Sequence, residues 1–209
     1  MSGPLMSEPW PPAVELVGRN AILTPLASTH APALSEAVKD GALWTLWYAN
    51  VPSPESMAED IAARLARREN GTWSPFAVVD AGTGLPVGMT SYLNIDREHR
   101  RLEIGSTWYR RSVQRTAINT ECKRLLLGHA FEALDCVAVE IRTHVLNGQS
   151  RRAIERLGAK LDGVLRNHSR TRDGALRDTC VYSIIASEWP TIKAYLDWRL
   201  ERGASVSAG

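Results

Sequence analysis

The chain has 209 residues, of which 44% are hydrophobic and 23% are charged, as in an ordinary globular protein. This length predicts one domain with a real hydrophobic core. The formal net charge of +2 is too small to indicate binding to nucleic acid or to a membrane surface, and no apolar run reaches the length of a membrane-spanning helix.

The two ends of the chain and its cysteines set further limits. Residues 1–14 are rich in proline and lack the apolar segment of a signal peptide, so we expect a flexible lead-in there. We expect a flexible tail at 203–209, which leaves a single domain at 15–202. The three cysteines are far apart and lack metal-ligand spacing; they are Cys122, Cys136 and Cys180. This usage predicts reduced thiols in a cytoplasmic protein without a metal site.

The first half of the chain predicts helices followed by a group of strands. The expected elements are a strand at 20–26, a helix to about residue 39, a helix at 54–68, and strands at 76–80, 86–95 and 102–109. Ser28 or Thr29 suits the N-cap of the first helix, because a hydroxyl accepts a free N–H of the first turn. Ala81-Gly82-Thr83-Gly84 is a hairpin signal, so the three strands should form an antiparallel meander.

The second half alternates between helical and strand patterns. The expected elements are a helix at 116–134, a strand at 137–141, a helix at 150–157, strands at 163–169 and 177–185, and a helix from about 187. The helix at 116–134 has one apolar face, and its charged residues, Glu121 and Lys123 among them, are expected to lie elsewhere. Gly158 suits the left-handed residue that ends a helix. The sum is a single α+β domain with a mixed sheet.

The order of these elements resembles that of a known family. Asn147-x-x-Ser150 followed by Leu157-Gly158-Ala159, with the segment 115–121 before them, is similar to the GCN5-related N-acetyltransferases and most closely to their RimJ/RimL branch. The likeness extends from about residue 16 to about residue 200. It implies a mostly antiparallel central sheet flanked by helices, acetyl-CoA as co-substrate, and acetyl transfer to a primary amine by direct attack. The acceptor stays open between a protein N-terminal α-amine and a small-molecule amine.

The loop that would hold the cofactor departs from the family pattern. That pattern is Q/R-x-x-G-x-G/A, whereas this chain has Ser112-Val113-Gln114-Arg115-Thr116-Ala117, in which only Ala117 fits. Other residues can still present inward-pointing N–H groups if their φ stays negative, and Arg115 can then add a charge-assisted contact to a phosphate. The alternative is a plain strand–helix connection that has lost ligand binding. The resemblance implies cofactor contacts at Trp108, Tyr109, Gln114, Arg115, Thr116, Ala117, Asn119, Asn147 and Ser150.

Three residues are candidates for proton transfer. By resemblance, Ser150 donates a proton to the departing CoA thiolate, while Asn147 lies beside the pantetheine arm and also suits the N-cap of the next helix. Glu103 and His168 are the candidate bases for the amine, because a buried carboxylate or an imidazole titrates near neutrality. Alternatives are a structural role for each residue and a water chain without a dedicated base.

Trp44, Trp47 and Tyr48 fall together between the first two helices. By resemblance this region closes over the acceptor, so we predict an aromatic wall of the substrate site; a hydrophobic core under a loop is the alternative. A homodimer through the last strands and the terminal helix is expected by analogy. Two other functions stay open, a non-catalytic acyl-CoA sensor and an enzyme that acetylates aminoacyl-tRNA. The near-neutral charge makes nucleic acid an unfavoured partner.

Overall fold

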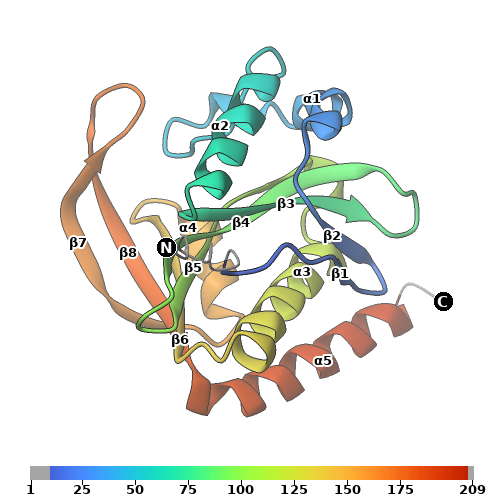
Figure 1. Ribbon diagram of the computed structural model, residues 1–209, viewed down its shortest axis with the longest axis vertical. Coiled ribbons are helices and arrows are strands. Elements are labelled where there is room, and N and C mark those ends of the chain that lie inside the picture. The colour runs from blue at the N-terminus through green and yellow to red at the C-terminus, as the bar shows by residue number, and fades with distance from the viewer. Residues whose placement is uncertain (1–9, 207–209) are drawn as a thin grey trace, which may run out of the picture.

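The structure is a computed structural model that describes residues 10–206, so residues 1–9 and 207–209 lie outside it. Within that range the chain forms one eight-stranded sheet in the order β1-β2-β3-β4-β5-β6-β8-β7 (Figure 1). The strands β1 to β8 are, in order, Leu16–Val17, Ala21–Pro25, Trp73–Asp80, Pro86–Asp96, Arg101–Tyr109, Ala138–His144, Lys160–Arg170 and Leu176–Ile185. Neighbouring strands are antiparallel except for the parallel pair β5–β6. The predicted α+β class and the β3–β4–β5 meander are confirmed.

Helices cover both faces of this sheet, so the molecule has three layers (Figure 1). The helices are α1 Ala31–Lys39, α2 Met57–Glu69, α3 Ala117–Gly128, α4 Gly148–Glu155 and α5 Trp189–Val206. One face carries α1 and α2, and the opposite face carries α3 with α5 packed against it. Each face buries its own cluster of apolar side chains, and the larger cluster lies on the α3 side.

Local hydrogen bonds explain where the helices begin. The Thr116 hydroxyl accepts from the N–H of Ile118 at the start of α3, and the Asn147 side chain accepts from the N–H of Ser150 at 3.0 Å in α4. The predicted cap of α1 by Ser28 or Thr29 is wrong, because residues 28–30 form a short 3-10 turn without a side-chain cap. Gly158 follows α4 with φ +92°, as predicted.

The structure of the long helix predicted at 116–134 differs from the prediction in two respects. α3 ends at Gly128, and the chain continues as a wider, π-type turn through residues 129–133. Glu121 and Lys123 do not lie away from the core, because each is only 6% exposed. Both side chains enter the interior and find polar partners there. Glu121 accepts from the backbone N–H groups of residues 19–21, and Lys123 donates to the Thr107 hydroxyl. A helical-period pattern does not reveal such partners.

The ends of the chain are described only in part. Of the predicted lead-in at 1–14, residues 1–9 lie outside the described range, while Trp10 packs against the larger apolar cluster. Of the predicted tail at 203–209, the backbone of residues 203–206 continues α5 and the rest is outside the described range. No helix within 10–206 is long and apolar enough to cross a lipid bilayer.

Candidate active site

Two parallel strands separate at the centre of the sheet. β5 and β6 pair only through residues 101–103 and 138–140, although β5 continues to Tyr109 and β6 to His144. Since parallel strands end at the same edge of a sheet, the chain leaves both strands beside this opening and forms α3 and α4 there. A V-shaped gap thus lies next to two helix N-termini, which present N–H groups and positive dipole ends.

A bulge in β5 starts where the gap opens. The register with β4 shifts between Met89 and Ser91, which gives β5 one extra residue, and Ser106 has φ +49°. Arg64 is a buried residue of α2, and its guanidinium donates to the Ser91 hydroxyl and to the Ser106 carbonyl at 3.4 Å each. This cation therefore holds the bulge from the α2 side.

The backbone beyond the bulge faces the gap. The Arg110 N–H donates to the Val87 carbonyl at 2.8 Å, so Arg110 points toward β4. Because hydrogen-bonding direction alternates along an antiparallel strand, the Tyr109 N–H points to the opposite side, into the gap. The Tyr109 carbonyl accepts from the Gln114 side chain at 3.0 Å. The Tyr109 N–H is therefore placed to donate to a carbonyl oxygen in the gap.

The loop from β5 to α3 is anchored from across the sheet. One carboxylate oxygen of Asp40, at the end of α1, accepts from the Arg110 side chain at 3.0 Å and from the Ser112 N–H at 3.1 Å. Hydrogen bonds from Ser112 and Arg110 lower the pKa of Asp40 to about 2. The carboxylate stays ionised in the physiological range and holds the loop in one conformation.

Arg115, which stands where the family pattern has a glycine, has a backbone conformation that favours glycine. Its φ is +66°, in the left-handed region, so the condition of a negative φ is not met at this residue. At the start of α3, Ala117, Ile118 and Asn119 have no helical acceptor for their N–H groups, and Thr116 takes only that of Ile118. The side chains of Arg115 and Thr116 are exposed beside these N–H groups.

The start of α4 places a hydroxyl on the other side of the gap. Ser150 lies in the first turn, half-buried, and its hydroxyl has no hydrogen-bond partner within residues 10–206. The helix is held to β8 because Arg151 donates to the Tyr182 hydroxyl at 3.0 Å, which donates to Glu155 at 2.8 Å. The Ser150 hydroxyl is thus free to turn toward a ligand.

The two candidate bases occupy different places. Glu103 lies on the α2 side at the closed base of the gap, where Asn94 donates to it at 2.7 Å and Arg142 lies 3.3 Å away. Burial raises the pKa of Glu103, and Arg142 opposes that shift. Glu103 lines a cavity of about 120 Å³. His168 is exposed on β7, with Nδ1 3.2 Å from the Thr179 hydroxyl, and Thr179 pairs with His144 on β6.

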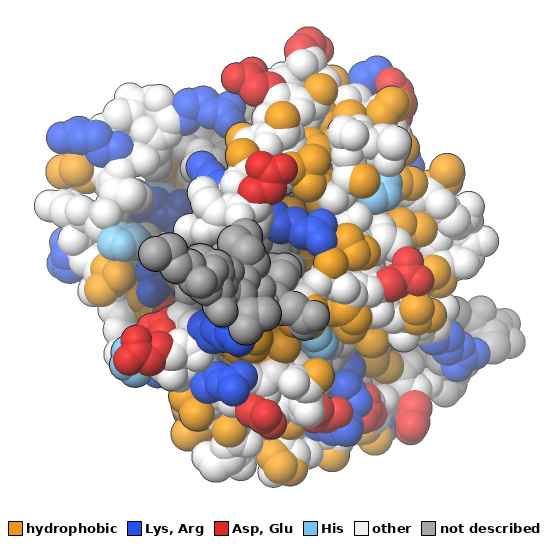
Figure 2. All heavy atoms as spheres, in the orientation of Figure 1, with side chains coloured by type: hydrophobic (Ala, Val, Ile, Leu, Met, Phe, Trp, Pro, Cys, Tyr) orange, Lys and Arg blue, Asp and Glu red, His pale blue; other side chains and the backbone are white. Residues whose placement is uncertain are grey.

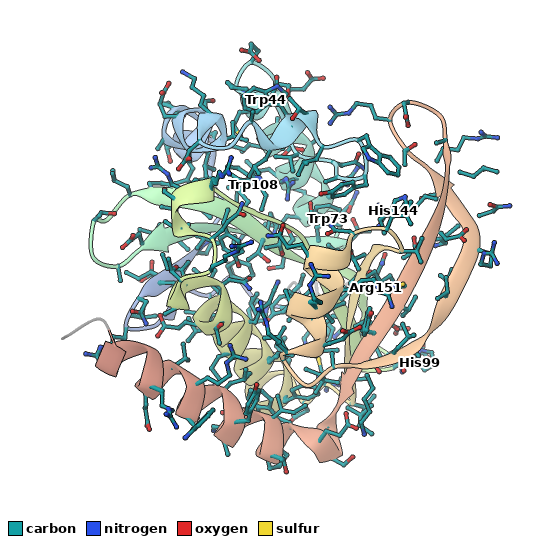
Figure 3. The ribbon with its side chains drawn as sticks, turned by 180° about the vertical axis from the view of Figure 1, so that it is seen from behind. Trp44, Trp73, His99, Trp108, His144 and Arg151 are labelled. Carbon is teal, nitrogen blue, oxygen red and sulfur yellow. The ribbon has the colours of Figure 1, made fainter. Side chains whose placement is uncertain are left out.

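The predicted aromatic wall divides into two parts. The rings of Trp47 and Tyr48 lie 5.1 Å and 6.4 Å from the ring of His144, whereas Trp44 packs against the smaller apolar cluster. In Figure 3, His144 lies between the β7–β8 hairpin and the part of the molecule that carries Trp44. Sequence reasoning missed His144; its only signal was its place at the end of a buried strand, three residues before Asn147.

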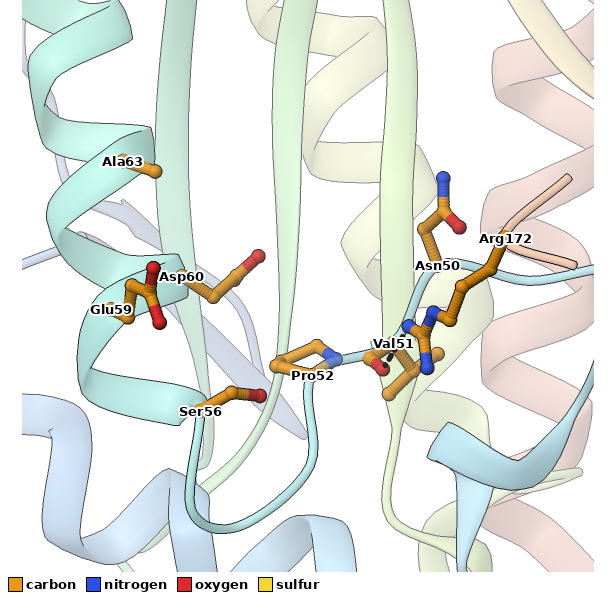
Figure 4. A pocket seen from close by; sticks show the side chains of 8 residues that line it. All are labelled: Asn50, Val51, Pro52, Ser56, Glu59, Asp60, Ala63 and Arg172. Atoms are coloured by element: carbon orange, nitrogen blue, oxygen red, sulfur yellow. Dashed lines mark hydrogen bonds between the residues drawn. The ribbon is translucent and has the colours of Figure 1, made fainter. Parts of the chain in front are cut away.

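The β7–β8 hairpin reaches across to this wall. Arg172, near the hairpin tip, donates to the Val51 carbonyl at 3.3 Å and to the Trp44 carbonyl at 3.5 Å (Figure 4). Beside this contact lies a cavity of about 280 Å³, lined by Asn50, Val51, Pro52, Ser56, Glu59, Asp60, Ala63 and Arg172. Figure 2 shows a hollow between the hairpin and α2 with Lys and Arg side chains on its wall.

All three cysteines are free and buried, and burial raises the pKa of Cys122 to about 12 and of Cys136 to about 11. Neither of these two is therefore a thiolate near neutral pH. Residues 10–206 contain no group of three or more His, Cys, Asp or Glu that could hold a metal ion.

Comparison with known proteins decides the family. The acetyltransferase (GNAT) domain family matches residues 20–160. The chain belongs to the GCN5-related N-acetyltransferases. The "Putative ribosomal N-acetyltransferase YdaF" of Bacillus subtilis is 30% identical to this N-acetyltransferase over 149 residues. The match covers 70% of this chain and 78% of that relative.

Solved structures agree with this assignment. A GCN5-related N-acetyltransferase from Brucella melitensis matches with a TM-score of 0.82 and 30% identity, covering 92% of this chain and 87% of that one. RimJ of Mycobacterium smegmatis, solved in complex with CoA-disulfide, shares the fold with a TM-score of 0.74 and 23% identity, over 91% of this chain and 95% of that one.

The family uses acetyl-CoA, and the residues of this site fit such a ligand. The gap leaves the edge of β5 free along residues 104–109, so an extended chain can bind there as a strand would. The N–H groups at the start of α3, beside the left-handed backbone of Arg115, suit a pyrophosphate.

Proposed function

We propose that this protein transfers an acetyl group from acetyl-CoA to a primary amine, either the α-amine of a protein N-terminus or a small-molecule amine. The observation that carries the proposal is the gap between β5 and β6 with two helix N-termini at its mouth. A protein acceptor is supported by the printed name of the Bacillus subtilis relative, a ribosomal N-acetyltransferase.

In this proposal the gap holds the thioester in line with the amine. Gln114, Arg115, Thr116, Ala117 and Asn119 surround the pyrophosphate at the start of α3. Asn147 lies beside the pantetheine arm. The backbone of Trp108 and Tyr109 borders the thioester, and the Tyr109 N–H donates to its carbonyl oxygen, where negative charge develops during the reaction.

The chemistry is a direct displacement. The amine nitrogen, once deprotonated, forms a bond to the carbonyl carbon while the carbon–sulfur bond breaks. The Ser150 hydroxyl gives a proton to the leaving thiolate. Glu103 is the favoured base, because it is buried on the α2 side with a raised pKa, and it acts through water from the base of the gap. His168, which is exposed on β7, is the second candidate.

Calorimetry and mass spectrometry test the proposal. Acetyl-CoA should bind the wild-type protein, and an amine panel should yield free CoA and an amine heavier by one acetyl group. Arg115→Gly keeps the backbone conformation but removes the cation. It should weaken binding of acetyl-CoA by about tenfold at low salt and less at high salt. Absence of binding at millimolar acetyl-CoA would refute the cofactor role, and binding without turnover of any amine would favour an acyl-CoA sensor.

Two substitutions test the proton transfers. Ser150→Ala should lower kcat by about 100-fold with little change in the affinity for acetyl-CoA. The wild-type rate should fall as the pH falls through the raised pKa of Glu103, and Glu103→Gln should abolish this dependence of the rate on pH. A Glu103→Gln enzyme with the wild-type rate and pH profile would exclude Glu103 as the base.

We also propose a homodimer and a cytoplasmic location. Apolar side chains are exposed on the outer strand β7, at Leu161, Val164 and Leu165, and on α5, at Trp198. Three free thiols suit a reducing compartment. The mass measured by light scattering should be twice that of the 23.1 kDa chain.

A further inference from the structure

His144 ends β6 with a buried side chain that is only 3% exposed. Its Nδ1 accepts a hydrogen bond from the N–H of Leu146 at 3.0 Å, so this nitrogen carries a lone pair. The neutral ring then has its proton on Nε2. The backbone turn after β6 therefore fixes His144 as a hydrogen-bond donor rather than a base.

The Nε2 atom of His144 has no hydrogen-bond partner within the described part of the chain. Buried polar groups nearly always find a partner, since an unpaired donor loses its bond to water without replacement. The neighbouring rings of Trp47 and Tyr48 leave this donor unpaired, because the indole of Trp47 has no acceptor and the Tyr48 hydroxyl makes no hydrogen bond to it. An oxygen atom of a ligand would supply the missing acceptor for the Nε2–H group.

His144 lies level with the reacting end of the gap. On the parallel strands β5 and β6, Glu103 is paired with Glu140. Four residues further along β6, His144 therefore lies opposite the region of Thr107 on β5, beside the bulge where β5 turns away. Glu140 and Glu103 lie on the same face of the sheet as His144, because strand side chains alternate. His144 thus borders the gap from the α2 side, where Trp47 and Tyr48 cover it.

The surroundings of His144 favour the neutral form of its ring. Burial is the main cause that lowers the pKa of His144, and Arg177 on β8 acts in the same direction, whereas Asp178 opposes it. The N–H of a neutral ring donates to an atom with a free lone pair. The single lone pair of a neutral alkyl amine is used in the attack on the thioester, and the other nitrogens of a polyamine are protonated, so neither offers a second acceptor. A peptide or an amino-acid amide adds a carbonyl oxygen two bonds from its nitrogen-bearing carbon.

We propose that His144 is an acceptor-binding residue whose Nε2–H donates to the carbonyl oxygen next to the reacting amine. The acceptors are therefore α-amines that carry an adjacent carbonyl, such as peptide N-termini, rather than simple alkyl amines. Trp47 and Tyr48 hold the neighbouring side chain of the acceptor. This inference rests on the proposed function and narrows its acceptor class.

Alaninamide and 2-aminopropane form a matched pair of probes, because alaninamide has a carboxamide where 2-aminopropane has a methyl group. His144→Phe keeps an aromatic ring of similar size but removes the donor, and His144→Gln keeps an N–H donor. His144→Phe should lower kcat/KM for alaninamide by about tenfold and that for 2-aminopropane by less than about twofold. The Kd for acetyl-CoA should not change, and His144→Gln should recover part of the loss.

The ratio of kcat/KM for alaninamide to kcat/KM for 2-aminopropane tests the role of His144. The difference in intrinsic reactivity of the two amines cancels when this ratio is compared between the variant and the wild type. An equal loss for both amines in His144→Phe, or no loss for either, would overturn the inference. If His144→Phe does not fold, the wild-type protein still gives a test by NMR. Alaninamide added with CoA should shift the Nε2–H resonance of His144, whereas 2-aminopropane should not; no shift with alaninamide would refute the role. Failure of wild-type turnover with every amine would instead refute the proposed function.

Discussion

Lys123 carries an ammonium group into the interior on α3, where its only hydrogen-bond partner in the described chain is the Thr107 hydroxyl at 3.1 Å. Burial without a carboxylate partner lowers the pKa of Lys123 to about 8. Thr107 in turn contacts the Thr90 hydroxyl at 2.7 Å, so the cation ends in a short chain of hydroxyl groups beneath the bulge. A buried, weakly paired cation opposes folding at neutral pH.

Replacing this cation by an isosteric apolar side chain should therefore stabilise the protein. Below pH 8 the lysine is protonated in both states, and the folded state bears the full desolvation cost. Between about 8 and the ordinary value of 10.5 the unfolded state binds more protons, so wild-type stability should rise with pH. Lys123→Met should raise the free energy of unfolding by about 2 kcal/mol at neutral pH and flatten this rise. Urea unfolding at two pH values measures both effects.

Lys39→Met is the control for this change, because Lys39 is a solvent-exposed partner of Glu36. It should change the free energy of unfolding by less than about 0.5 kcal/mol at either pH. If Lys123→Met destabilises the protein at neutral pH and keeps the wild-type dependence on pH, the lysine is not desolvated as described.

At the scale of elements, one helix completes the hydrogen bonding of a strand turn. The Glu121 carboxylate of α3 accepts from the N–H groups of Asn20 at 2.5 Å, Ala21 at 2.7 Å and Arg19 at 3.1 Å, between β1 and β2. Gly18 leaves room for this carboxylate, since a Cβ there would lie 2.6 Å from it. The first hairpin of the sheet is thus tied to α3, the helix that follows β5.

Glu121→Ala should lower the free energy of unfolding by about 3 kcal/mol, because it leaves three backbone N–H groups, that of the buried Ala21 among them, without their acceptor. Denaturant unfolding measures this loss. Glu36→Ala removes a carboxylate from an exposed pair with Lys39 and should cost less than about 0.5 kcal/mol. A similar small cost for both variants would contradict the structural role of Glu121.

The elements themselves were largely predictable from periodicity. The strands of the meander and the helices at 57–69 and 117–128 follow patterns of period 2 and 3.6 that survive in the structure. The cap by Asn147 was predicted because it is made within one turn of chain. The left-handed φ of Arg115 was not, since an arginine gives no local signal for a conformation that the loop and its anchor Asp40 impose.

At the scale of the whole molecule, segments far apart in sequence meet over the α2 side of the gap. Among the interactions described above, only the hydrogen bonds of Arg172 join the loop that carries Trp44, Trp47 and Tyr48 to the β7–β8 hairpin. The same loop contacts β6 through the rings of Trp47 and Tyr48 against His144. These contacts are few and partly exposed, so the two segments should separate more readily than the core.

Arg172→Ala should loosen this closure. We expect faster amide hydrogen exchange in residues 43–51 and a rise of a few-fold in the KM for the acceptor, with little change in Tm. Hydrogen exchange followed by mass spectrometry and steady-state kinetics measure the two effects. Arg170→Ala is the matched control, because Arg170 donates only within its own hairpin, to the Gly174 carbonyl. Unchanged exchange at 43–51 would show that Arg172 does not hold the loop.

By itself, the sequence determined the α+β class and the order of the elements, because these rest on patterns within a few turns of chain. It also indicated the family and the segments that border the gap, through the order and spacing of motifs along the chain. Only the tertiary structure decided which polar side chains enter the interior and what they meet. Glu121 binds a turn 100 residues away, and His144 lies against Trp47 through the pairing of β6 in the sheet. A hydrogen-bond donor or acceptor can be buried only where a partner meets it, and that meeting is set by register and packing rather than by neighbours in sequence.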